Sequence, residues 1–100
     1  MLDEFTHENT QQYIGDTFRI EFTDGNVVEL KLERVDFLMA KHLQPKMKRD
    51  AFAMIFRGPK HLLLTQHMFP LQHPTLGVVE IFLVPIGMEE AGALYEAVFN

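Results

Sequence analysis

The chain has 100 residues, a length that fits a single domain spanning residues 1–100. It contains no cysteine, which excludes disulfide scaffolds, thiolate metal sites and cysteine nucleophiles, and its hydrophobic content of 47% is enough for a packed core. The net charge of −5 argues against a general nucleic-acid binder.

The first ten residues lack the basic and apolar regions of a signal peptide. Every apolar stretch is far shorter than the ~20 residues that cross a bilayer as a helix. We therefore expect a cytoplasmic protein that does not bind a membrane.

Residues 5–16 predict a short helix over the rim of the core. Thr6 is a suitable N-cap, Glu8 suits the positive end of the helix dipole, and Gly15 is a suitable stop.

Two alternating segments, 17–23 and 27–33, predict a β-hairpin around the turn signal Asp24-Gly25-Asn26. A three-residue loop would pair Phe22 with Val28, and in the same register Ile20 with Leu30. After Leu32 the alternation slips by one residue, and this slip predicts a β-bulge near Glu33 and Arg34, or a change of sheet.

Further alternating segments complete the expected sheet. Residues 51–57 are apolar on both faces and predict a central strand, and residues 62–64 predict a short strand. Residues 69–73 and 78–84 predict a hairpin in which Leu71 pairs with Val79, and Pro70 leaves its strand one free edge. A polar loop over 87–93 and a final strand over 94–99 follow.

These elements predict a mainly β domain. The expected architecture is a small six-stranded antiparallel barrel or two-sheet sandwich with one short N-terminal helix. In either form the apolar C-terminal segment serves as the closing strand, because an exposed strand of that composition would promote aggregation.

Basic residues gather in one part of the sequence. Residues 41–60 hold six Lys or Arg and one acid, whereas the rest of the chain holds three against thirteen. A solvated loop is the common explanation for such a run, and an anion or an acidic partner surface is the alternative. The candidate partner-binding residues are Lys41, Lys46, Lys48, Arg49, Arg57 and Lys60.

Five histidines raise the question of a metal site. His67 and His73 lie six residues apart, and six residues of strand span ~20 Å, so these two cannot share an ion unless the chain folds between them. We therefore expect no metal and no cofactor. His67 and His73, with Asp50 or Glu80, are the residues to test if a site exists.

Catalysis has little support in the sequence. The chain contains neither serine nor cysteine, so the two commonest nucleophiles are missing, and no known catalytic motif is present. We expect that the protein is not an enzyme.

The C-terminal half carries a recognisable pattern. Gln66, Phe69, Leu71, His73, Leu76, Gly77, Phe82 and Pro85, followed by the ending Tyr95-x-Ala97-x-Phe99-Asn100, are arranged as in a family of small bacterial domains of unknown function. The chain resembles this family over nearly its whole length. The resemblance implies no known activity, and it suggests an association with phage-tail-like or secreted-fibre genes.

The sequence therefore predicts a non-enzymatic protein-binding or assembly module of a bacterial system. Its partner would be another protein, bound through a strand edge or the basic segment, and the chain itself would be a monomer or homodimer. The alternative is a β-barrel that binds a small ligand or a metal.

Overall fold

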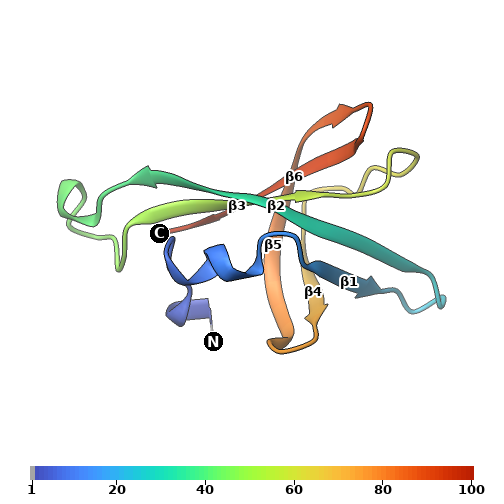
Figure 1. Ribbon diagram of the computed structural model, residues 1–100, viewed down its shortest axis with the longest axis horizontal. Coiled ribbons are helices and arrows are strands. Elements are labelled where there is room, and N and C mark those ends of the chain that lie inside the picture. The colour runs from blue at the N-terminus through green and yellow to red at the C-terminus, as the bar shows by residue number, and fades with distance from the viewer. Residues whose placement is uncertain (1) are drawn as a thin grey trace.

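The computed structural model describes residues 2–100 (Figure 1). Six antiparallel strands close into one barrel, in the spatial order β1-β2-β3-β6-β5-β4. Their bounds are β1 (Thr17–Glu21), β2 (Val27–Met39), β3 (Ala51–Arg57), β4 (His67–His73), β5 (Gly77–Glu89) and β6 (Gly92–Phe99). The predicted fold class is confirmed, and the strands form a barrel rather than a sandwich.

The predicted N-terminal helix forms as short 3-10 turns, η1 (Leu2–Glu4) and η2 (Asn9–Tyr13). The N-cap of η2 is Glu8 rather than the predicted Thr6. Thr6 still stabilises the turn, because its Oγ1 accepts the backbone N–H of Asn9 at 3.0 Å while Asn9 Oδ1 accepts the Thr6 N–H at 2.8 Å. Gly15 has a φ of 93°, a left-handed conformation that ends the segment before β1.

The predicted register of the β1–β2 hairpin is wrong by two residues. Ile20 pairs with Val28 rather than Leu30, and Phe22 lies at the turn, where its N–H bonds to the Asn26 carbonyl. The observed register sets Arg19 opposite Glu29, so that opposite charges face each other across the strands. Both registers keep the same apolar face inward, which is why alternation alone could not separate them.

The β-bulge expected near Glu33 and Arg34 is present, because the pairing of β2 with β3 shifts between Leu32 and Arg34. β3 is buried on both faces, as its apolar sequence predicts, and it pairs with β2 and β6. It is not a central strand, because every strand of the closed barrel has two neighbours. The hairpin pairing of Leu71 with Val79 is confirmed too.

One predicted strand and one predicted loop are wrong. Residues 62–64 form no strand, and the Leu64 N–H instead donates to the hydroxyl of Tyr95 at 2.8 Å. Residues 87–93 form no polar loop, because β5 runs to Glu89 and β6 begins at Gly92 after a tight turn. The final strand lies between β3 and β5, so the closing role expected for the C-terminal segment is confirmed.

Side chains fill the interior of the barrel. The largest fully buried ones are Tyr95, Phe18, Phe52, Phe56, Ile20, Leu30, Leu32, Met54, Ile55, Leu71, Ile81 and Leu83. Phe52 and Phe99 stack with ring centroids 5.0 Å apart, and Phe18 meets Phe56 edge to face at 5.2 Å. The interior of the barrel is therefore a packed hydrophobic core.

Candidate functional site

The end of the β2–β3 hairpin projects from the barrel, at the left of Figure 1, along the longest dimension of the molecule, 43 Å. It projects because β2 pairs with β1 only from Val27 to Lys31 but continues to Met39 beside β3. We call residues 37–48 the hairpin tip.

The hairpin tip combines exposed apolar side chains with exposed lysines. Four of its large apolar residues are exposed, with exposed fractions between 44% and 66%: Phe37, Leu38, Met39 and Leu43. Lys41, Lys46 and Lys48 are exposed beside them. An apolar group rimmed by charge on a projecting element is typical of an interaction surface.

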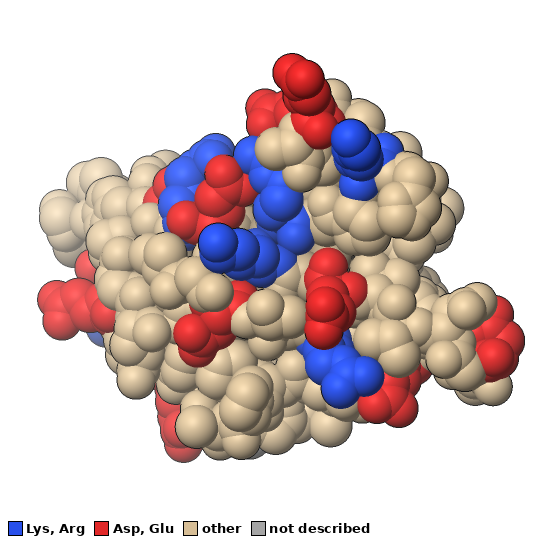
Figure 2. Space-filling model, turned by 45° about the vertical axis from the view of Figure 1, so that its right-hand side comes forward, with Lys and Arg blue, Asp and Glu red and all other residues tan. Residues whose placement is uncertain are grey.

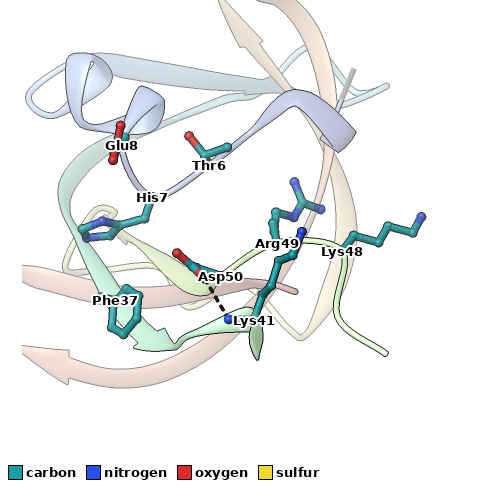
Figure 3. Close-up of a pocket in the computed structure, with 8 residues that line it drawn as sticks. All are labelled: Thr6, His7, Glu8, Phe37, Lys41, Lys48, Arg49 and Asp50. Atoms are coloured by element: carbon teal, nitrogen blue, oxygen red, sulfur yellow. Dashed lines mark hydrogen bonds between the residues drawn. The ribbon is translucent and has the colours of Figure 1, made fainter. Parts of the chain in front are cut away.

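A cleft of about 540 Å³ lies between the β2–β3 hairpin and residues 2–16, which precede β1 and which we call the N-terminal segment. Figure 3 shows the residues that line it, which are Thr6, His7, Glu8, Phe37, Lys41, Lys48, Arg49 and Asp50. The His7 ring packs edge to face on Phe37 with centroids 5.7 Å apart, and Asp50 Oδ1 accepts the backbone N–H of Lys41 at 2.7 Å. The N-terminal segment thus forms one wall of the cleft and the basic segment forms the other.

Arg49 holds the N-terminal segment in place. Its Nη1 donates to the carbonyl oxygens of Leu2 and Phe5, each at 2.6 Å, and its guanidinium lies 5.6 Å from the ring centroid of Phe99. These contacts give Arg49 a structural role. It therefore differs from the exposed lysines with which it was predicted to bind a partner. Lys48 contacts Asp3 only loosely, at 4.0 Å with both side chains mostly exposed.

Arg57 lies away from the tip, near the turn of the β5–β6 hairpin. Its Nε donates to Glu33 at 2.8 Å, and its Nη1 donates to Glu89 at 2.8 Å and to the Gly92 carbonyl. The hydrogen bond from Arg57 is the main cause that lowers the pKa of Glu33, and the bonds to Glu33 and Glu89 raise the pKa of Arg57.

The six basic candidates therefore do not form one patch. Lys41, Lys46, Lys48 and Arg49 belong to the hairpin or its base, whereas Arg57 is paired elsewhere and Lys60 lies in the loop after β3. Figure 2, which brings the opposite end of the molecule forward, shows basic and acidic side chains side by side on that face.

His67 and His73 occupy opposite ends of β4. His67 is exposed, whereas His73 is buried and its Nδ1 accepts the N–H groups of Thr75 and Leu76. Its Nε2 therefore carries the hydrogen and donates to Asp16 Oδ2 at 2.7 Å. Both ring nitrogens of His73 are engaged, so it has no free position for an ion.

Among residues 2–100, no three His, Asp or Glu side chains are placed to hold a metal together. The pairing of His73 with Asp16 joins residues far apart in sequence, and only a correct register of β1 and β4 could have predicted it. In the same described range, no helix has the length and apolar character needed to cross a membrane.

Comparison with known proteins places the chain in a family. A family model described as "Domain of unknown function (DUF6916)" matches residues 5–99, so the chain belongs to this family. This confirms the expectation of a small domain of unknown function. No curated protein and no solved structure matches the chain.

Proposed function

For this member of the DUF6916 family, we propose a non-enzymatic role as a protein-binding or assembly module whose binding surface is the hairpin tip. The observation that carries the proposal is the combination of four exposed apolar side chains with three exposed lysines on an element that leaves the barrel. Exposed apolar surface of this kind costs solubility in an isolated domain, and contact with a partner removes that cost.

The lysines favour a partner surface that is acidic as well as apolar. Lys41 and Lys46 make no ion pair among the described residues, and Lys48 makes only the loose contact with Asp3. Unpaired cations around an apolar centre steer an acidic partner during encounter and then form the polar rim of the interface.

The packed interior counts against the alternative of a barrel that binds a small ligand. Ligand-binding barrels hold their ligand in an internal cavity, whereas Phe18, Phe56 and Tyr95 fill this one. The engaged nitrogens of His73 likewise leave the metal-binding alternative without a ligand set.

The proposed partner belongs to a bacterial system. The resemblance of the C-terminal pattern supports a bacterial system associated with phage-tail-like or secreted-fibre genes.

The test is co-purification from the native host with quantitative mass spectrometry. Wild type is compared with the tip-reversed variant Lys41→Glu/Lys46→Glu/Lys48→Glu. Its matched control, Arg19→Glu/Lys31→Glu/Lys60→Glu, changes the net charge equally at exposed positions outside the tip. Thermal melting must show that this control stays folded, because Arg19→Glu removes the charge pairing of Arg19 with Glu29. Specific partners should fall at least ten-fold with the tip-reversed variant and persist with the control. Partners that persist with the tip-reversed variant would refute the proposal.

A further inference from the structure

A second apolar surface lies where β5 and β6 separate. β5 pairs with β4 from Gly77 to Leu83, and its pairing with β6 begins only at Val84. The first half of β5 and the end of β6 therefore diverge, and they leave a groove of about 310 Å³ that we call the β5–β6 groove.

The β5–β6 groove is apolar and carries acidic residues. Met68, Phe82 and Val98 line it with exposed fractions between 45% and 52%, together with the exposed carboxylates of Asp3 and Glu80. From His61 to Asn100 the chain contains no Lys or Arg. Among residues 2–100, the only basic residue that lines the groove is Arg49, whose Nη1 is bound to the carbonyl oxygens of Leu2 and Phe5.

The groove and the hairpin tip have complementary chemistry. The tip presents apolar side chains with three lysines, and the groove presents apolar side chains with two carboxylates, of which Asp3 contacts Lys48 of the same chain loosely at 4.0 Å. Leu43 is the most exposed large apolar residue of residues 2–100, at 66%, and it lies at the end of the tip. A groove of this volume has room for a side chain of that size as a central anchor.

We propose that the β5–β6 groove binds the hairpin tip of a second copy of this chain. The proposal rests on the proposed function, because it uses the same binding surface and names the partner. Arg49 lines the β5–β6 groove and also the cleft between the hairpin and the N-terminal segment, which residues of the tip line too. The tip and the groove therefore lie at the same end of the molecule. Two copies related by a twofold axis then each donate one tip and accept one, which closes the assembly as a dimer.

The first measurement is the mass of the purified full chain by sedimentation velocity and light scattering over a hundred-fold concentration range. We expect a dimer of twice 11.6 kDa that dissociates more readily as the salt concentration rises. A wild-type protein that stays monomeric at every concentration overturns the inference.

Charge-swapped variants then test the interface itself. The tip-reversed variant sets an acidic tip against an acidic groove, and the groove-reversed variant Asp3→Lys/Glu80→Lys sets a basic tip against a basic groove. Each should dissociate at least ten-fold more readily than wild type. A mixture of the two restores opposite charges at both contacts, so a heterodimer should form.

The matched control Arg19→Glu/Lys31→Glu/Lys60→Glu should dimerise as wild type does, and thermal melting establishes that every variant is folded. A dimer that forms equally well in the tip-reversed variant overturns the inference, as does a mixture that yields no heterodimer. The proposed function is judged separately, because a monomeric wild type whose host partners still depend on the tip would refute only the self-association.

Discussion

Replacing Tyr95 by Phe should destabilise the barrel through a single hydrogen bond. The Tyr95 side chain is 1% exposed, and its hydroxyl accepts the backbone N–H of Leu64 at 2.8 Å. Without the hydroxyl, the N–H of the buried Leu64 has no acceptor, and a buried donor left in this state costs ~1–3 kcal/mol. For a domain of this length each kcal/mol lowers Tm by roughly 4–8 °C, so we expect a fall of about 4–24 °C.

Urea unfolding followed by circular dichroism measures the change in the free energy of unfolding directly. Tyr13→Phe is the matched control, because Tyr13 is the other tyrosine of the chain, is only partly buried and makes no hydrogen bond through its hydroxyl among the described residues. We expect less than ~0.5 kcal/mol for the control. A Tyr95→Phe protein as stable as this control would refute the argument, since it would show that the Leu64 N–H finds another acceptor or water.

Two further predictions concern the β5–β6 hairpin and its ion pairs. Gly92→Ala should cost ~2–3 kcal/mol, because Gly92 has a φ of 134° and an added Cβ would collide with the Gly58 carbonyl oxygen. Gly87→Ala, which meets nothing within 4 Å, is its control in the same urea experiment. Glu33 has a pKa below its usual 4.5, so its pairing with Arg57 stabilises the fold above pH 4.5 and is lost as the pH falls below it. Glu33→Gln should therefore flatten the loss of stability as the pH falls below 4.5, measured by thermal melting, and an unchanged slope would contradict this reasoning.

Much of the fold follows from side-chain alternation. A strand with one buried face must alternate, so residues 17–21 and the first part of β2 could be identified from the sequence. The break in the alternation likewise identified the β-bulge between Leu32 and Arg34. The burial of β3 on both sides could be predicted because both of its faces are apolar. These features depend only on neighbours in the sequence and on the need to bury apolar surface.

The missed features depend on contacts between distant residues. The register of β1 on β2 differs between two choices that bury the same face, and the cross-strand pairing of Arg19 with Glu29 distinguishes them. Leu64 is apolar and follows two leucines, yet the hydroxyl of Tyr95 takes its N–H in place of a strand partner. Residues 87–93 look like a loop because of their glycines and carboxylates, but a two-stranded hairpin that projects from the barrel can be polar on both faces.

The basic segment shows most clearly why clustering in sequence does not identify a binding surface. A buried or half-buried cation must find acceptors, and the sequence does not reveal where these lie. Arg49 finds them in the backbone of Leu2 and Phe5, more than forty positions away, and Arg57 finds them in Glu33 and Glu89. Reversing the charge of either arginine would therefore disturb the fold and would reveal nothing about a partner. Lys41, Lys46 and Lys48 are the residues whose reversal tests binding alone, because their charges satisfy no buried group of the chain.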